Sequence, residues 1–328
     1  MKRETLEKYQ VVVYLAAIAL GLLVGSLAQE SISPLELILW PLLGLLLYTT
    51  FVQVPLRHIR DAFGDRRFLA AAVVGNFLVV PVIVWCLLQL LPDRPAIQLG
   101  VLLVLLVPCT DWFITFSHLG KGDTKYAIAF SPVSLLLQIA LLPLYLWLFL
   151  GTDFTMTIAR PELFLAFGGL IGLPLLGAYL TERWIETSRR KGVLERLGWF
   201  PVPLLGAVVF VIAATQVSLV LASLDVLGLL ILVYLAYLIA AALGARLLGG
   251  VFSLPPAQGR VLAFSMGTRN SFVVLPLALA LPASWELAVI AIVFQSLVEL
   301  LGMVFYLWWI PGRLFPTATR SAYPDVEG

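Results

Sequence analysis

The sequence predicts an all-α polytopic membrane protein with ten transmembrane helices, arranged as two inverted five-helix repeats. Three observations predict this class: the apolar composition, the distribution of basic residues, and two interrupted apolar segments. Of the 328 residues, 61% are hydrophobic and 12% are charged, and the mean hydropathy is +1.01. A soluble domain carries about 25% charged residues. At about 20 apolar residues per crossing, the chain has room for roughly ten helices.

The same composition excludes most soluble enzymes, nucleic-acid-binding proteins and secreted disulfide-stabilised proteins. A net charge of +2 is too small to indicate an anionic partner. The two cysteines, Cys86 and Cys109, lie inside apolar runs, so we expect neither a disulfide framework nor a metal site. We therefore expect no enzymatic activity and no resident cofactor. The expected partners are the lipid bilayer and a small-molecule or metalloid substrate, and the sequence indicates no oligomeric state.

Ten apolar segments follow one another along the chain, and each is long enough to cross the hydrocarbon core with modest tilt. No small-residue cleavage site follows the first segment, so we expect a retained helix rather than a signal peptide. The expected helices are 10–28, 34–56, 67–91, 96–119, 126–150, 161–181, 198–222, 225–251, 260–281 and 284–310.

The basic residues predict the orientation, because cytoplasmic loops carry an excess of Lys and Arg. With ten spans and both termini in the cytoplasm, 18 of the 21 basic residues fall on the cytoplasmic side. Arg94 and Arg160 fall outside, and Arg269 lies inside a helix. Nine spans would place later basic loops on the wrong side. We therefore expect a multi-pass protein of the plasma membrane. The cytoplasmic set is Lys2, Arg3, Lys8, Arg57, Arg60, Arg66, Arg67, Lys121, Lys125, Arg183, Arg189, Arg190, Lys191, Arg196, Arg246, Arg260, Arg313 and Arg320.

One long polar connection precedes the tail, at 182–197, and we expect it to be a cytoplasmic loop. Residues 1–181 then hold the first repeat, helices 1 to 5, together with helix 6. Residues 198–310 hold helices 7 to 10, and 311–328 form a cytoplasmic tail of the same membrane-embedded unit. Because five is odd, the second repeat enters the membrane from the opposite side, which is the inverted-repeat arrangement of many secondary transporters.

Two helices are interrupted at corresponding positions of the two halves. The fourth segment breaks at the sequence PCTD, beginning at Pro108, and the ninth breaks at MGTRNS, beginning at Met266. Paired interruptions of this kind indicate a substrate site, because each half-helix amino end offers unpaired amides and a positive dipole end. The alternative is that Pro108 only kinks a helix and Gly267 only allows close packing. The candidate substrate-binding residues are Cys109, Thr110, Asp111, Thr268, Arg269 and Asn270.

Three charged residues, Asp111, Arg269 and Glu299, lie within the apolar spans, where ionisable side chains are functional by default. A carboxyl in the middle of the last helix can bind a proton, or as a carboxylate help to coordinate sodium. Two structural alternatives stay open: Glu299 as a buried partner of Arg269, and mutual neutralisation of Asp111 and Arg269. The candidate ion-coupling residues are Glu299, Gln295, Ser131 and Ser134, with H⁺ as the expected coupling ion and Na⁺ as the alternative. Asn76 and Gln138 are further candidates for lining a cavity.

The stretch PCTDWFITFSHLGKGDTKYAIAF resembles the fourth-helix signature of the arsenite permeases, the arsenical-resistance branch of the bile acid:sodium symporter superfamily. The ninth-helix stretch FSMGTRNSF is similar to the crossover of that family at Asn270, and Glu299 matches its acidic residue in the tenth helix. The resemblance extends from about residue 67 onward. The residues that match the fourth-helix signature are Pro108, Cys109, Leu119, Lys121, Gly122 and Asp123.

This resemblance implies discontinuous helices 4 and 9 that cross each other, a core domain and a panel domain. It also implies export of trivalent arsenite or antimonite, by antiport with protons, with Cys109 as the cysteine needed for transport. Trivalent arsenic is thiophilic, which suits a soft sulfur ligand. Two residues depart from the family pattern: Arg269 stands where an uncharged residue is expected, and Phe272 where many members are acidic.

The alternative function is a sodium-coupled symporter of a small organic anion. Arg269 and the half-helix dipoles would then hold a carboxylate, with Glu299, Gln295 and Ser134 near the sodium ion.

Overall fold

The computed structural model describes residues 10–27, 33–54, 64–158, 161–188, 191–222 and 224–316, and the regular structure in these ranges is helical. Four helical segments in them are long and apolar enough to cross a membrane: Arg66–Leu88, Thr124–Leu150, Leu224–Val251 and Ala283–Leu314. Shorter apolar helices are found at Val12–Leu27, Leu37–Phe51, Pro95–Leu106 and Pro201–Thr215. This is the all-α pattern of a polytopic membrane protein that the composition predicts.

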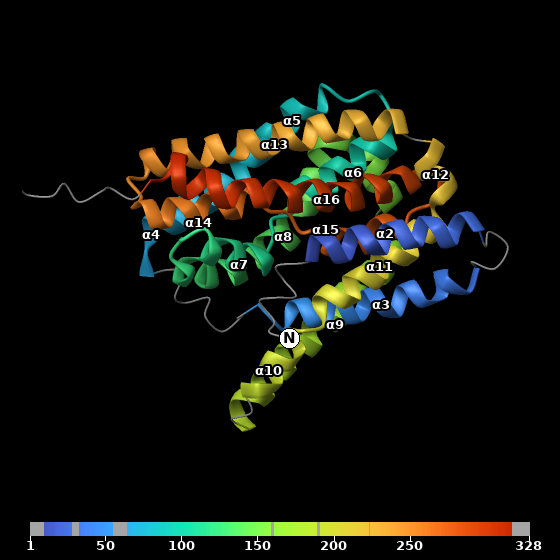
Figure 1. Ribbon diagram of the computed structural model, residues 1–328, viewed down its shortest axis with the longest axis horizontal. Coiled ribbons are helices and arrows are strands. Elements are labelled where there is room, and N and C mark those ends of the chain that lie inside the picture. The colour runs from blue at the N-terminus through green and yellow to red at the C-terminus, as the bar shows by residue number, and fades with distance from the viewer. Residues whose placement is uncertain are drawn as a thin grey trace, which may run out of the picture.

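The helices form two groups (Figure 1). In the first, which we name the panel group, α11 packs on α2 and α3, and α3 packs on α9. The panel group consists of α2 (Gln10–Leu27), α3 (Ser33–Phe51), α9 (Pro161–Ser188) and α11 (Pro201–Thr215).

The second group, which we name the core group, contains both interrupted segments. In it α6 packs on α16, α13 packs on α14 and α16, and α7 packs on α8 and α14. Its helices are α4 (Arg66–Val74), η3 (Gly75–Val79), α5 (Val80–Leu88), α6 (Pro95–Leu106), α7 (Trp112–Leu119), α8 (Thr124–Ile158), α13 (Leu224–Val251), α14 (Pro256–Gly267), α15 (Ser271–Leu279) and α16 (Glu286–Trp309). Short connecting elements are α10 (Lys191–Leu197), α12 (Val217–Ala222), η4 (Ala283–Trp285) and η5 (Ile310–Leu314).

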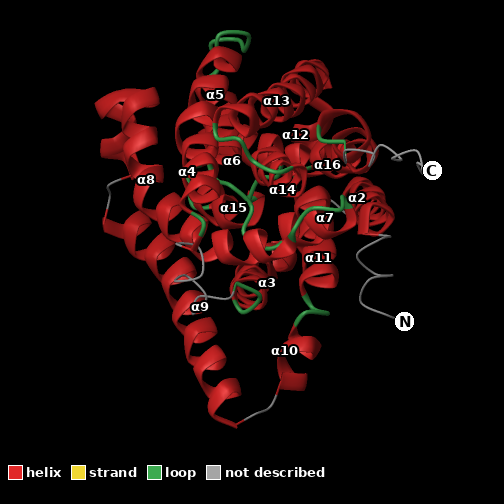
Figure 2. Ribbon diagram, turned by 90° about the vertical axis from the view of Figure 1, so that its left-hand side faces the viewer, coloured by secondary structure: helices red, strands yellow, loops and turns green. Residues whose placement is uncertain are grey.

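The segment 182–197, expected as a loop, is helical over most of its length. Helix α9 continues into this segment as far as Ser188, and the short helix α10 forms its carboxyl-terminal part at Lys191–Leu197 (Figure 2). The physical reason is that polarity does not end a helix: Glu and Arg are good helix formers, and Thr181–Ser188 contains neither Pro nor Gly. Helix α8 likewise runs to Ile158, beyond the expected end at 150.

Several residues used to predict the orientation lie outside the described part of the chain. They are Lys2, Arg3, Lys8, Arg57, Arg60, Arg160, Arg189, Arg190 and Arg320. The same is true of the final part of the predicted tail, 317–328.

Burial separates the interior helices from the outward-facing ones. Every residue of α6 except Pro95 and Gln98 is buried, and α14 is buried from Gln258 to Gly267. A helix that is apolar and covered on all sides belongs to the interior of a bundle. In contrast, large apolar side chains are exposed elsewhere, such as Leu37 at 77% and Leu148 at 66%. Such an apolar outer surface suits contact with lipid rather than water.

The first helix of the core group is fixed at its start by Asp65. This carboxylate caps α4 by accepting hydrogen bonds from the backbone N–H groups of Arg67 and Phe68, both at 3.1 Å. The bond from Phe68 is the largest cause that lowers the pKa of Asp65. Gln258 donates to the other oxygen of the same carboxylate at 2.9 Å, which ties α4 to the start of α14.

A π-helical stretch, η3, interrupts the third expected segment and brings its backbone close to the ninth. A Cβ atom at Gly75 would lie 2.7 Å from the sulfur of Met266, so a side chain there would have to displace the methionine. The next residue, Asn76, is fully buried. Single-turn π segments are frequent at functional sites.

Candidate functional site

The two interrupted segments meet each other in the centre of the core group. Cys109 donates its backbone N–H to the carbonyl of Thr268 at 3.2 Å, and Asn270 donates to the carbonyl of Val107 at 2.8 Å. These bonds make a short antiparallel bridge between Pro108 and Arg269. The resemblance implies that the broken helices cross, and the structure joins them at this bridge. We name the bridge and its flanking residues the crossover.

Local sequence explains why both helices stop at this point. Proline lacks an N–H and forces the preceding residue into extended conformation, and Val107 has φ −107° and ψ 103°. In the second break, a Cβ atom at Gly267 would lie 2.5 Å from the ring of Tyr306, so a side chain there would displace the tyrosine. Thr268 after it is extended, with φ −96° and ψ 139°.

The thiol of Cys109 lies on one side of the crossover. The residue is 3% exposed, and its Sγ donates to Oδ1 of Asp111 at 3.3 Å. Asp111 occupies the cap position before α7. Between them, the carbonyl of Thr110 accepts a hydrogen bond from the hydroxyl of Ser131 in α8. Asn270 donates to the hydroxyl of Thr110 at 3.4 Å, and this side-chain hydrogen bond also connects the second break to the first.

Glu299, a residue of α16, stabilises the second break through hydrogen bonds. Its Oε2 accepts hydrogen bonds from the backbone N–H of Arg269 at 2.8 Å and from Nε2 of Gln295 at 2.7 Å. Ser271, the first residue of α15, donates to Oε1 of Gln295 at 3.0 Å. Glu299 therefore contacts Arg269 through its backbone amide, and it is 4% exposed.

The guanidinium of Arg269 bonds to oxygens of three other elements. Its nitrogens donate to the carbonyls of Leu105, Ser265 and Met266 and to Oδ1 of Asn76. Asn76 is held in turn by its own donations to Ser265 Oγ at 3.0 Å and to the Ala72 carbonyl at 3.1 Å. Protein oxygens therefore surround Nη1 and Nη2 of this cation, whereas its Nε has no hydrogen-bond partner among the described residues.

The structure brings most of the predicted site residues together. The crossover and its supports contain Cys109, Thr110, Asp111, Thr268, Arg269, Asn270, Gln295, Glu299 and Ser131. Ser134 lies one turn further along α8, and Gln138 one turn beyond it. Both are buried, and their side-chain polar atoms have no hydrogen-bond partner among the described residues. The described residues also contain no cluster of three His, Cys, Asp or Glu side chains that could hold a metal ion.

Several aromatic contributors were not predicted. The ring of Trp112 stacks on Tyr14 of the panel group at 6.1 Å and meets Phe272 edge-on at 5.5 Å. We name these three residues the aromatic layer; it lies between α2 and the two half-helix starts. Tyr237 of α13 donates to the carbonyl of Met266 at 2.7 Å. Phe272 stands out in the sequence only as a departure from the family pattern, and no sequence signal distinguishes Tyr14, Trp112 or Tyr237 from ordinary apolar packing residues.

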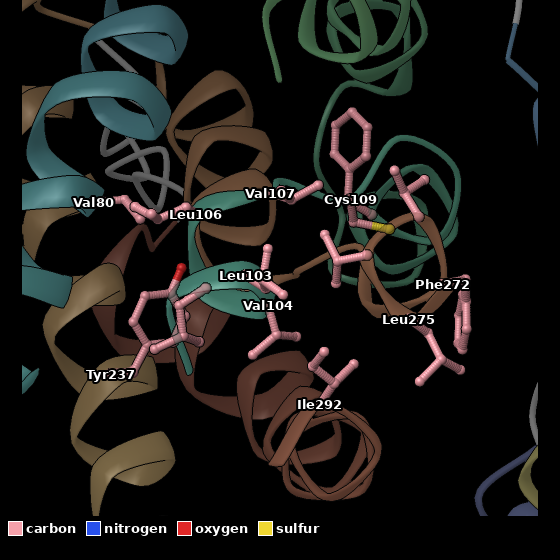
Figure 3. Packing of buried hydrophobic residues seen from close by; sticks show 14 of the residues in the cluster. Val80, Leu103, Val104, Leu106, Val107, Cys109, Tyr237, Phe272, Leu275 and Ile292 are labelled. Atoms are coloured by element: carbon pink, nitrogen blue, oxygen red, sulfur yellow. The ribbon is translucent and has the colours of Figure 1, made fainter. Parts of the chain in front are cut away.

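A close view separates the two sides of the crossover. Figure 3 shows Cys109 on the same side as Phe272 and Leu275, and Tyr237 on the other side with Val80 and Leu106. The thiol of Cys109 and the ring of Tyr237, which belongs to α13, thus lie apart in this view.

Comparison with known proteins gives a curated relative and a matching family model. Arsenical-resistance protein Acr3 from Alkaliphilus metalliredigens (strain QYMF) is 26% identical over 208 residues, which are 56% of this chain and 56% of that protein. The match thus spans little more than half the length of that relative. The family model described as the Sodium Bile acid symporter family matches residues 40–223, which include the first break. Since this match covers more than half of the chain, the protein belongs to the sodium bile acid symporter family.

Proposed function

We propose that this protein is a secondary transporter that exports trivalent arsenite or antimonite across the plasma membrane in exchange for protons. The observation that carries the proposal is the Cys109 thiol, which lies at the meeting point of two broken helices and bonds to Asp111 at 3.3 Å. Similarity to a protein named for arsenical resistance supports this substrate class.

The proposal includes the finer topology, ten transmembrane helices in two inverted repeats with both termini in the cytoplasm. In support of it, the described helices other than α10 and η5 fall into ten consecutive units. These units are α2, α3, α4–η3–α5, α6–α7, α8, α9, α11–α12, α13, α14–α15 and η4–α16. The two breaks fall in the fourth and ninth units, as inverted repeats require.

The chemistry at Cys109 is a ligand exchange on arsenic. Arsenous acid loses one hydroxyl group as the sulfur–arsenic bond forms, and the thiol proton leaves with that hydroxyl as water. Asp111 Oδ1, already the acceptor of the thiol hydrogen bond, is placed to pass the thiol proton to the departing hydroxyl, and the reverse step returns a proton to the sulfur when arsenous acid leaves. One thiolate binds arsenic less tightly than three would, and a transported substrate must be able to leave its site.

Glu299 is the proposed proton carrier. Its Oε2 accepts both the backbone N–H of Arg269 and the amide of Gln295. Protonation removes the negative charge that strengthens these two bonds, so it weakens the support of the second break. Proton occupancy and crossover geometry are thereby coupled.

A second candidate function is sodium-coupled symport of a small organic anion. Family membership favours it, together with the buried polar atoms of Ser134 and Gln138 that have no hydrogen-bond partner among the described residues. These atoms and the two half-helix amino ends would supply the ligands for sodium and a carboxylate.

The test uses everted membrane vesicles that contain the protein. Under a proton gradient, acid inside, they should accumulate arsenite above vesicles without the protein, and a protonophore should abolish the difference. Replacing sodium by choline should have no effect. Absence of accumulation, or uptake of a carboxylate that requires a sodium gradient, would exclude the proposed exchange.

A further inference from the structure

The guanidinium of Arg269 has a coordination shell rather than a single partner. Nη2 donates to three oxygens, Asn76 Oδ1 at 2.9 Å and the carbonyls of Ser265 and Met266 at 2.8 Å each. Nη1 donates to the carbonyl of Leu105 at 3.3 Å. The residue is 3% exposed. The four acceptors are neutral oxygens that converge on one positive charge.

The backbone oxygens come from the carboxyl ends of the two half-helices. Ser265 and Met266 belong to the last turn of α14, which ends at Gly267, and Leu105 belongs to the last turn of α6. These ends carry the negative pole of the helix dipole. In transporters with broken helices, such ends and unwound carbonyls bind the coupling cation.

An aromatic ring and an oriented amide complete the surroundings of the Arg269 guanidinium. The ring of Tyr237 lies 5.6 Å from the guanidinium carbon, within the range of a cation–π contact. Asn76 presents its oxygen to the cation because its amide nitrogen is used by Ser265 Oγ and the Ala72 carbonyl. A cation at this position therefore binds α6, α13, α14 and η3 to one another.

We propose that the Arg269 guanidinium is a tethered cation that fills a monovalent-cation site at the crossover, so that this site needs no sodium. In one respect the inference deepens the proposed function, because it explains how exchange with protons dispenses with sodium at this position. It also stands without arsenite as the substrate, since the shell consists only of protein groups.

An ordinary helix cap is the competing explanation, and it makes a different prediction. A capping arginine bonds the last carbonyls of its own helix, whereas Arg269 also bonds Leu105 of α6 and Asn76 of η3. If the residue only caps, its loss is not repaired by a free ion. If Arg269 substitutes for an ion, a small free cation restores the thermal stability that truncation of the side chain removes.

The experiment measures thermal unfolding of the purified full-length protein in detergent, in sodium chloride or choline chloride of equal ionic strength. Arg269→Ala empties the shell, Arg269→Met fills the space without charge, and Arg269→Lys keeps a tethered charge. We expect sodium, or guanidinium at low millimolar concentration, to raise the midpoint of Arg269→Ala in a saturable way. The parent, Arg269→Met and Arg269→Lys should show no such rise.

The proposal is overturned if neither cation stabilises Arg269→Ala, or if sodium stabilises the parent as much. Should Arg269→Ala fail to fold, Arg269→Lys decides: indifference to sodium supports the tethered charge, and a saturable sodium response contradicts it. Arsenite is absent from these measurements, so a failure of the proposed substrate leaves their outcome unchanged.

Discussion

Cys109 and Arg269 are attached to opposite strands of one backbone bridge, but their side chains enter different surroundings. The thiol bonds Asp111, whereas the guanidinium bonds the carboxyl ends of α6 and α14. Three acceptors already share Nη2 of Arg269. The shell therefore uses Nη1 and Nη2, whereas Nε of Arg269 has no hydrogen-bond partner among the described residues.

Glu299→Gln separates proton coupling from structural support. The introduced amide oxygen can still accept the Arg269 N–H, so the fold is retained, but the side chain can no longer carry a proton. We expect everted vesicles with this variant to equilibrate arsenite without accumulating it under a proton gradient. The measurement is the steady-state ratio of internal to external arsenite across a series of imposed pH gradients.

The matched control is Glu286→Gln, which changes a carboxylate at the first turn of the same helix, α16. Its accumulation ratio should equal that of the parent. Gradient-driven accumulation by Glu299→Gln at the parental level would show that another group carries the proton.

The identities of the crossover residues could be predicted from sequence, but their partners could not. Pro108 and Gly267 could be identified as the breaks because proline and glycine disfavour a helix by their residue type alone. The hydrogen-bond partners of the Arg269 guanidinium could not be predicted, because three of its four acceptors are backbone carbonyls, which any residue supplies. Tyr237 and the aromatic layer escape prediction for a related reason: aromatic residues are common in apolar runs.

Helix α6 lies so close to α16 that glycine is required at the contact. A Cβ atom at Gly100 would lie 2.7 Å from the carbonyl oxygen of Ala288 and 2.9 Å from Cβ of Ala291. Gly100→Ala should therefore force the two helices apart and lower the free energy of unfolding by about 1–3 kcal/mol. The measurement is the thermal or denaturant midpoint of the purified protein.

Gly228→Ala in α13 provides the control, because nothing lies within 4 Å of the position its Cβ would occupy. Alanine there should leave stability unchanged or raise it, since glycine costs about 0.5–1 kcal/mol relative to alanine inside a helix. Equal effects of the two substitutions would contradict the close approach of α6 and α16.

Helix extents were predicted well where clear turn residues bound an apolar run, as for α13 at Leu224–Val251 against an expected 225–251. They were predicted poorly where polarity alone suggested an end, as for α9, which continues to Ser188. The π-helical stretch η3 leaves no pattern in the sequence because neighbouring residues on all faces are apolar. The ten-span orientation itself stays a prediction.

The arrangement of the two helix groups suggests what must move during transport. The aromatic layer joins Tyr14 of the panel group to Trp112 and Phe272 of the core group. Cys109, at 3% exposure, lies next to these half-helix starts. For the proposed transport, we expect access of the substrate to the thiol to require separation of the panel and core groups at this layer.

The two cysteines of the chain allow the most direct test of a substrate site at the crossover. Cys109 is buried there, whereas Cys86 is exposed on α5. Each is replaced by serine, and accumulation of arsenite under a proton gradient is measured in everted vesicles with equal amounts of protein. Cys86→Ser should accumulate arsenite like the parent, and Cys109→Ser should not exceed vesicles without the transporter. Accumulation by Cys109→Ser at the parental level would contradict the proposed role of the thiol.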